Sequence, residues 1–252
     1  MKTYISARRK YLPRFFLFVL VFLALLCVLL LLGSFGSYYS PSSRETALEE
    51  CRAIVIIDAG HGGEDGGAVG VNGVYEKDLN LKIALLLEEW LRAEGIPTVL
   101  TRSEDILLYD KTSNYLGQKK VQDLAARRKI AEQYENAVLV SIHMNAFPES
   151  KYAGLQVYYS QNDATSRELA SEIQSCIQEH LSPENTRKIK AAGENIYLLD
   201  RLQCPAVLVE CGFLSNPEEC ERLSNEAYQK KLTFLLSRSI VNYLNSSAKN
   251  LP

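Results

Sequence analysis

The sequence predicts a single α/β domain that follows one apolar N-terminal segment. Three observations support this fold class. Strand-like and helix-like segments alternate from Cys51 onward, a pattern typical of a sheet flanked by helices. The chain has 252 residues and is 47% hydrophobic, so it can bury a sizeable core. One unbroken apolar run precedes the alternating segments and is distinct from them.

Six short segments are predicted to be strands because they are apolar and rich in β-branched residues. They are Ile54–Asp58, Pro97–Thr101, Ala137–His143, Leu155–Ser160, Ile196–Leu199 and Ala206–Glu210. Four helices are expected. One begins near Leu79, with Asp78 as its N-cap, and the others are Gln122–Gln133, Thr165–Leu181 and Glu226–Asn245. In Ser103–Val121 the apolar residues follow neither a helical nor a strand spacing. This segment is expected to be a long loop that either contacts substrate or is solvated.

Phe15–Leu32 is an apolar run of 18 residues without charge. As a helix it would be about 27 Å long, close to the hydrocarbon thickness of a bilayer. Five basic residues precede it, which predicts a cytoplasmic amino terminus and an extracytoplasmic remainder. The expected order is a basic segment (1–14), a transmembrane anchor (15–32), a linker (33–50) and a folded domain (51–252). The alternative is a cleaved signal sequence and a secreted protein, but the apolar part of a signal sequence is usually shorter.

The distribution of charge argues against a nucleic-acid partner. Without the five basic residues of the amino terminus, 23 basic and 30 acidic side chains remain, and no basic stripe is present. The cysteines match neither a zinc motif nor a disulfide framework, so they are expected to act as small hydrophobic residues.

Three ionisable side chains end or follow predicted strands, where open α/β sheets place their ligand sites. His61 follows the first strand in a glycine-rich turn, His143 ends the third strand and Glu210 ends the last one. Glu76 lies just before the predicted helix. Two imidazoles and a carboxylate suit tetrahedral zinc with an open position for water, but their spacing matches no short metal motif. From the residues alone, a hydrolase site and a set of structural residues remain equal alternatives.

Five successive motifs resemble those of zinc-dependent N-acetylmuramoyl-L-alanine amidases. They are Ile57-Asp-Ala-Gly-His-Gly-Gly63, Glu76-Lys-Asp78, Leu100-Thr-Arg102, Ser141-Ile-His-Met-Asn-Ala146 and Pro205-Ala-Val-Leu-Val-Glu-Cys-Gly-Phe-Leu-Ser-Asn-Pro217. The resemblance covers nearly all of residues 51–245. Ala59, where proline is usual, and Met144, where alanine is usual, depart from the pattern. Arg102 and Arg127 are expected to form structural ion pairs.

The resemblance implies that His61, Glu76 and His143 bind Zn²⁺ and that Glu210 is the catalytic carboxylate. It also implies a mixed, mostly parallel sheet of the phosphorylase/hydrolase-like kind. The bond cut would join the lactyl group of muramic acid in peptidoglycan to the L-alanine of the stem peptide. Glu210 would take a proton from water and deliver it to the leaving amine, while zinc polarises the amide carbonyl. Asn145 is expected either to bind substrate or to fix its loop.

Several features together resemble the sporulation type of this family, among them the N-terminal anchor, the Ser103–Val121 segment and the Asn185–Lys188 stretch. Those enzymes remove the stem peptide from cortex muramic acid before muramic-δ-lactam is made. The alternatives are a vegetative autolysin that separates daughter cells, and a non-catalytic peptidoglycan-binding protein with a structural metal. An activator protein is a further hypothesis, because an unregulated wall hydrolase endangers its own cell.

Overall fold

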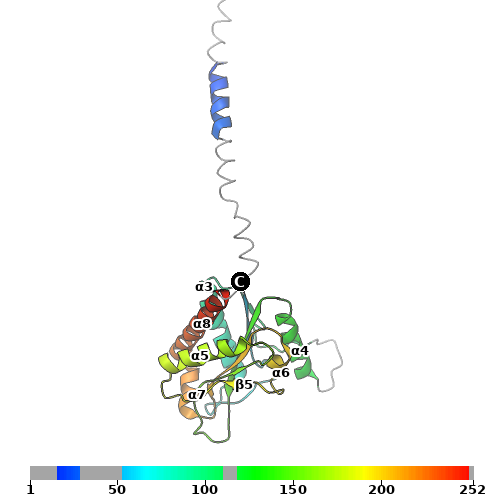
Figure 1. Cartoon of the computed structure of the whole chain (residues 1–252), viewed down its shortest axis with the longest axis vertical. Coiled ribbons are helices and arrows are strands. Elements are labelled where there is room, and N and C mark those ends of the chain that lie inside the picture. The colour runs from blue at the N-terminus through cyan, green and yellow to red at the C-terminus, as the bar shows by residue number, and fades with distance from the viewer. Residues whose placement is uncertain (1–15, 29–52, 110–117, 250–252) are drawn as a thin grey trace, which may run out of the picture. The chain divides into compact units, whose positions relative to one another are not determined.

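The computed structural model describes residues 16–28, 53–109 and 118–249 (Figure 1). The chain divides into two compact units, Met1–Cys51 and Arg52–Pro252. In the first unit, residues 16–28 form a helix of exposed, apolar side chains. Over the described part of the chain, no helix is both long and apolar enough to cross a membrane. The described residues therefore give the transmembrane prediction no support, and residues 1–15 and 29–52 lie outside them.

The second unit is an α/β domain with a mixed sheet, as the sequence predicts. Within the described residues the sheet has six strands: β1 (Ile54–Ala59), β2 (Thr98–Leu100), β3 (Ala137–Asn145), β4 (Gln156–Tyr159), β5 (Lys190–Ala191) and β6 (Ala206–Phe213). Their order is β2-β1-β3-β6-β4-β5. The first four strands in this order are parallel to one another, whereas β4 is antiparallel to β6 and parallel to β5. The sheet is therefore mostly parallel, with two reversed strands at one edge.

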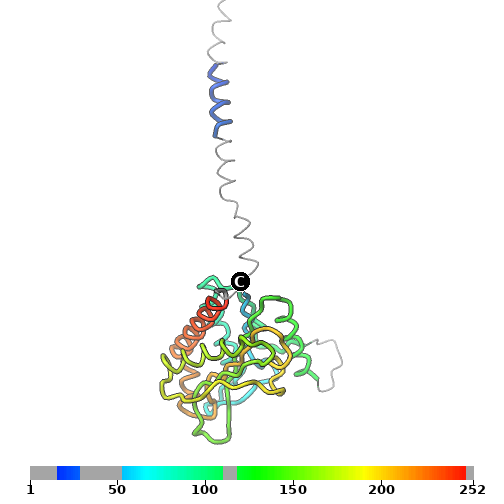
Figure 2. The backbone as a smooth tube through the Cα atoms, in the orientation of Figure 1, coloured from blue at the N-terminus to red at the C-terminus, as the bar shows by residue number. Residues whose placement is uncertain are grey.

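Helices cover both faces of this sheet (Figure 1). One face packs against α3 (Glu76–Ala93), α5 (Ser166–His180), α7 (Pro217–Ser224) and α8 (Glu226–Lys249), and α5 and α8 lie side by side (Figure 2). The other face packs against α4 (Lys119–Ala131) and α6 (Tyr197–Arg201). Val55 and Val209 point into the first core, and Ile56 and Leu139 into the second. Because successive strand residues point to opposite faces, unbroken Val and Ile runs supply both cores.

One predicted strand and one predicted helix cap are wrong, and two observed elements lack a prediction. Residues 197–199 begin α6 and are not a strand. A short apolar run with buried Leu198 and Leu199 can form either structure, so the sequence pattern does not distinguish the two. The helix α3 begins at Glu76, so Asp78 lies in its first turn and is not its N-cap. Strand β5 is too short to produce a sequence pattern. Helix α7 does carry a signal, since the Asn216 side chain accepts hydrogen bonds from two backbone amides and a proline follows it.

The long loop predicted for Ser103–Val121 is shorter than expected. Helix α4 begins at Lys119, so the end of the predicted loop is helical. Residues 110–117 lie outside the described residues. The described part contacts the turn that contains His61: Asp105 accepts a hydrogen bond from the Gly63 backbone amide at 2.7 Å, and Lys119 forms an ion pair with Glu64.

Candidate active site

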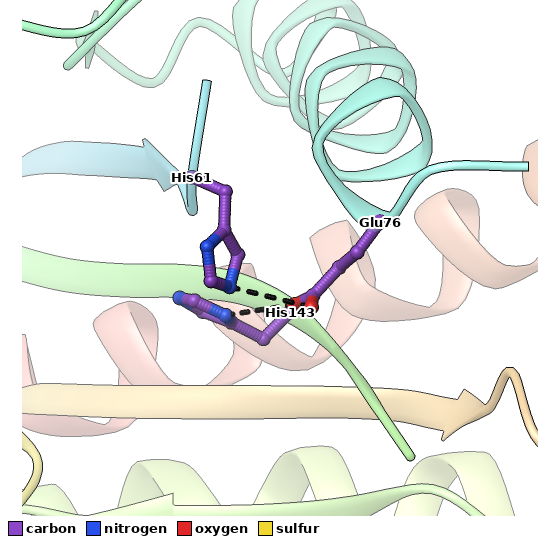
Figure 3. A group of neighbouring side chains, drawn as sticks. All are labelled: His61, Glu76 and His143. Carbon is purple, nitrogen blue, oxygen red and sulfur yellow. Dashed lines mark hydrogen bonds and ion pairs between the residues drawn. The ribbon is translucent and has the colours of Figure 1, made fainter. Parts of the chain in front are cut away.

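The carboxyl ends of the parallel strands β1, β3 and β6 meet at one edge of the sheet. This edge carries His61 and His143, and α3 begins beside it with Glu76 (Figure 3). Glu210 lies at the same edge, opposite His143 in the register of β3 and β6. The antiparallel strand β4 starts at the same edge with Gln156. The topology therefore brings together all four residues that the resemblance implies for the active site.

His61 lies in a turn with unusual backbone angles. Its φ is 60°, and no other non-glycine residue in the described ranges has a positive φ. Such a conformation is unfavourable for a residue with a Cβ atom. Gly62 and Gly63 follow, with φ values of 139° and 54° that glycine adopts readily. The turn directs the His61 Nε2 atom toward Glu76 Oε2, at 3.3 Å, and leaves Nδ1 3.0 Å from Asp65 Oδ2.

Two buried arginines hold the backbone of this turn. Arg102 donates hydrogen bonds to the carbonyl oxygens of Ala59, at 2.8 Å, and Gly60, at 2.9 Å. Arg127 donates to the carbonyl oxygens of Ala59 and His61, each at 2.7 Å. Three consecutive carbonyl groups are thus fixed by guanidinium groups that are almost completely buried. These hydrogen bonds offset the unfavourable backbone angle of His61.

Arg127 forms the structural ion pairs that the sequence predicts, with Asp58 at 2.7 Å and Asp123 at 2.8 Å. Ser141 donates a further hydrogen bond to Asp58 at 2.6 Å. Burial alone would raise the pKa of Asp58, but the charge of Arg127 and these hydrogen bonds lower it to about 2. Arg102 forms no ion pair within the described residues and binds backbone carbonyl groups instead.

Glu76 is the buried centre of the site. Its Oε1 atom accepts a hydrogen bond from the Met144 backbone amide at 3.0 Å and lies 3.0 Å from His143 Nδ1. Its Oε2 atom accepts a hydrogen bond from the Ala68 backbone amide at 2.8 Å and faces His61. Both imidazole rings therefore turn toward one carboxylate whose position is fixed by the backbone (Figure 3).

Two further polar residues support this cluster, and the sequence reasoning missed both. Asn80 is fully buried one turn after Glu76, and its amide donates to Glu76 Oε1 at 3.3 Å and to the Gly60 carbonyl at 3.1 Å. The spacing of four residues on a helix was the available signal for this pair. Asp65 faces His61 Nδ1, as carboxylates commonly do behind a metal-binding histidine. Nothing in the sequence marks Asp65, because the contact depends on the turn.

Glu210 lies beside His143 because these two residues are register partners in the paired strands β6 and β3. Gln156 is the register partner of Glu210 on its other side, so the three residues form a row on one face of the sheet. His143 and Glu210 lie within their strands rather than at the predicted ends, since β3 continues to Asn145 and β6 to Phe213. The Oε2 atom of Glu210 is buried and has no hydrogen-bond partner among the described residues.

The two carboxylates of the site have opposite electrostatic surroundings. Burial would raise the pKa of Glu76, but hydrogen bonds and charge from His143 and His61 hold it well below its usual range. Burial raises the pKa of Glu210, and the negative charge of Glu76 adds to this against the opposing charge of the imidazoles. Glu76 is therefore suited to remain charged as a ligand, and Glu210 is suited to accept and release a proton.

The cluster has the donor set and the space that a metal ion needs. The candidate ligand atoms of His61, Glu76 and His143 all lie within 4.8 Å of one another. Ligand atoms of a tetrahedral zinc ion, each bound at about 2.0–2.2 Å, are about 3.3–3.6 Å apart, so small side-chain movements suffice. A Cβ atom at Gly67 would lie 2.5 Å from Glu76 Oε2, and one at Gly60 would overlap the His143 ring. The glycines thus leave the space that these side chains occupy.

Asn145 is the fifth residue predicted for the site. Its backbone carbonyl accepts a hydrogen bond from the Leu214 backbone amide at 2.8 Å, and the residue is half-buried at the end of β3. This bond is consistent with the loop-fixing alternative. A substrate contact by the Asn145 side chain stays a prediction.

The site combines two imidazoles with a buried carboxylate, and a second carboxylate of raised pKa lies beside them. This arrangement is typical of hydrolases that combine a metal ion with a general base. Residues 55–242 match the family model described as N-acetylmuramoyl-L-alanine amidase, and the chain belongs to this family, Amidase_3. It is an enzyme that hydrolyses a linear amide bond of peptidoglycan.

Known relatives cover most of the chain. The germination-specific N-acetylmuramoyl-L-alanine amidase of Bacillus subtilis (strain 168) is 33% identical over 224 residues, which are 89% of this chain and 93% of that protein. The solved CwlD amidase from Clostridioides difficile, in complex with the GerS lipoprotein, is 38% identical with a TM-score of 0.74 and covers 77% of this chain and 100% of its own. The amidase AmiC2 of Nostoc punctiforme is 31% identical with a TM-score of 0.64, covering 77% of this chain and 97% of its own.

Proposed function

We propose that this amidase cleaves the bond between N-acetylmuramic acid and L-alanine with one zinc ion bound by His61, Glu76 and His143. The observation that carries the proposal is the convergence of these three side chains on one edge of the sheet, beside Glu210. A zinc ion held there would act as a Lewis acid toward the amide carbonyl and lower the pKa of water.

Glu210 acts as the general base and then as the general acid in this proposal. Its register position places it next to His143, and its Oε2 atom has no other partner among the described residues. A carboxyl group with a raised pKa can take a proton from water and then deliver it to the amine of L-alanine as the bond breaks. The Met144 and Ala68 backbone amides keep Glu76 in place during these transfers.

We further propose that the substrate is spore cortex peptidoglycan and that the product is the precursor of muramic-δ-lactam. The similarity to a germination-specific amidase over 89% of the chain supports this role over that of a vegetative autolysin. Glu210 argues against a non-catalytic wall-binding protein, because a purely structural metal site has no need of a general base.

The apolar N-terminal segment and the choice of partner belong to the same proposal. Residues 15–32 would anchor the protein in the membrane with the amidase domain outside the cytoplasm, or would be removed as a signal sequence. Alkaline extraction of membranes from expressing cells tests the anchor. Release of the full-length protein into the extract would exclude a transmembrane anchor. Because a similar amidase is known in complex with a lipoprotein, an extracytoplasmic lipoprotein is the class of activator that we propose.

The test is a digest of purified cortex peptidoglycan by the full chain, with zinc and with a chelator, analysed by mass spectrometry. We expect free stem peptides that begin with L-alanine, formed only with metal. Glu210→Gln should retain about one zinc per chain and lose about 10²–10⁴-fold in rate. Glu218→Gln, which alters an exposed carboxylate on α7, is the matched control and should have wild-type activity.

Two outcomes would contradict the proposal. Undiminished cleavage after removal of the metal would exclude zinc, and full activity of Glu210→Gln would remove Glu210 from the mechanism. Full turnover by the purified chain alone would rule out an obligatory activator without affecting the proposed chemistry.

A further inference from the structure

The row of side chains at the active edge continues past Glu210 to a cation. Gln156 is the register partner of Glu210, and its Oε1 atom accepts a hydrogen bond from Arg187 Nη2 at 2.7 Å. Arg187 precedes β5, which pairs with β4. Adjacent strands are about 4.8 Å apart, so Gln156 lies roughly 10 Å from His143 and Arg187 lies beyond it. The row therefore leads from the metal cluster to a guanidinium group.

Arg187 is held in place by its surroundings. Its backbone amide donates to Asn185 Oδ1 at 3.0 Å, and its carbonyl accepts from Gln178 Nε2 at 2.8 Å. Its guanidinium carbon lies 4.9 Å from the centre of the Phe213 ring. Asn185 is buried and donates to the Leu155 carbonyl at 2.8 Å, which fixes this segment to β4. A binding group that is already ordered loses little entropy when a ligand arrives.

The positive charge of Arg187 acts on Glu210 at a distance, where it opposes the rise of the pKa of that carboxyl. No carboxylate of the described residues forms an ion pair with it, and Gln156 is its one side-chain acceptor in that part of the chain. Its Nε atom is buried without a hydrogen-bond partner among the same residues. A guanidinium group has five N–H donors and binds planar carboxylates in a bidentate manner. A half-buried arginine whose donors are largely unused next to a catalytic edge is suited to an anionic ligand.

We propose that Arg187, oriented by Gln156, binds a carboxylate of the stem peptide on the leaving-amine side of the scissile bond. This proposal rests on the amide hydrolysis proposed above. The leaving peptide begins with L-alanine, and each extended residue adds about 3.3–3.6 Å. A carboxylate carried by the second residue of the peptide would therefore lie about 7–10 Å from the reacting carbonyl, close to the roughly 10 Å between His143 and Gln156, whose side chain holds the guanidinium of Arg187.

Such a contact would select acidic stem peptides over amidated ones. The carboxylate is the same in the bound substrate and in the transition state, so its recognition lowers KM more than it raises kcat. A carboxamide at the same position offers neither the charge nor a second acceptor oxygen to the guanidinium.

The test uses the zinc-loaded full chain and two muramoyl-peptide substrates that differ only in a carboxylate or a carboxamide at the second peptide residue. We expect the wild-type enzyme to prefer the acidic substrate by about 10- to 100-fold, mainly through KM. Arg187→Met should remove this preference, so that the acidic and the carboxamide substrate have similar KM values. Arg187→Lys should restore part of it, and Arg167→Met, on the exposed face of α5, is the matched control.

An equal loss on both substrates would overturn the subsite, because it would show that Arg187 acts on packing or on Glu210. Binding of the two peptides to Glu210→Gln, with and without Arg187→Met, separates this outcome from failure of the proposed reaction. A wild-type enzyme that cleaves neither substrate would show that the chain alone lacks the proposed activity. Tighter binding of the acidic peptide that depends on Arg187 would still support the subsite, and equal binding of both peptides would refute it.

Discussion

Two arginines at opposite ends of the active edge have contrasting environments. Arg127 is almost completely buried beneath the His61 turn, where Asp58, Asp123 and backbone carbonyl groups receive its hydrogen bonds. Arg187 lies half-buried before β5 and bonds through its side chain to one amide oxygen among the described residues. The first charge forms two buried ion pairs, whereas the second forms none with the described residues and is available to an anionic ligand.

This difference separates the folding role of a buried charge from a binding role. Removing one partner of a buried ion pair leaves the other charge uncompensated, which is strongly destabilising. Removing a cation that forms no ion pair with the described residues leaves no buried carboxylate there without its counter-charge, so stability should change less than binding. The same substitution at both positions therefore distinguishes the two roles.

The largest effect is expected for Arg127→Met. It leaves Asp58 and Asp123 buried without a counter-charge, and we expect a loss of about 3–5 kcal/mol in the free energy of unfolding, measured by urea denaturation. Zinc affinity should fall as well, because the His61 carbonyl loses its donor. The neighbouring Arg128→Met removes exposed interactions with Glu132 and Tyr197 and should lower the free energy of unfolding far less than Arg127→Met. Equal losses for the two variants would show that burial of the Arg127 pairs does not matter.

Acidification should have the next largest effect. The pKa of Asp58 is lowered from 3.8 to about 2, so its contribution to stability is complete above about pH 4 and is lost as the pH falls toward 2. The shift corresponds to about 2 kcal/mol. Urea unfolding at a series of pH values should show this dependence in the wild type and in Arg187→Met, but to a smaller extent in Asp58→Asn. An Asp58→Asn curve parallel to that of the wild type would exclude Asp58 as a source of the acid sensitivity.

The smallest effect on stability is expected for Arg187→Met. The hydrogen bond to Gln156 and the contact with Phe213 are lost, but no ion pair among the described residues is broken, so the free energy of unfolding should fall by only about 1 kcal/mol. Urea unfolding beside Arg127→Met gives the direct comparison. A loss as large as that of Arg127→Met would mean that Arg187 has a structural role, and the contrast between the two arginines would disappear.

Much of the fold is predictable from the sequence because its strands are strongly apolar. Five of the six predicted strands coincide with observed ones, since β-branched runs buried on both faces leave few alternatives. Residues 197–199 are helical rather than extended. Their leucines can be buried in either structure, and only the packing of α6 against the sheet decides between the two. Strand β5 is defined by its pairing with β4, which has no local signature.

The candidate site is predictable where residue type and strand position act together. His61, His143 and Glu210 stand out as ionisable residues at or near the ends of apolar strands, and Glu76 precedes a clear helical stripe. Their convergence follows from the parallel order of β1, β3 and β6, which the motifs imply only through family resemblance.

The supporting residues are less visible in the sequence. Asp65 contacts His61 only because the turn has a positive φ. The significance of Arg187 is that no described carboxylate forms an ion pair with it, which is a property of the folded protein. Arg102 resembles an ion-pairing residue in the sequence, but the carbonyl groups that it binds are brought to it by the fold.

The pairing of β3 with β6 has a consequence for how this enzyme can vary in evolution. If β6 moved by one residue against β3, Val209 or Cys211 would take the place of Glu210, and the carboxylate would point into the apolar core on the other face. An insertion or deletion within these strands would thus abolish catalysis even where every residue type was retained. Length changes between members of the family are therefore expected in the loops, whereas the paired strands should keep a constant length.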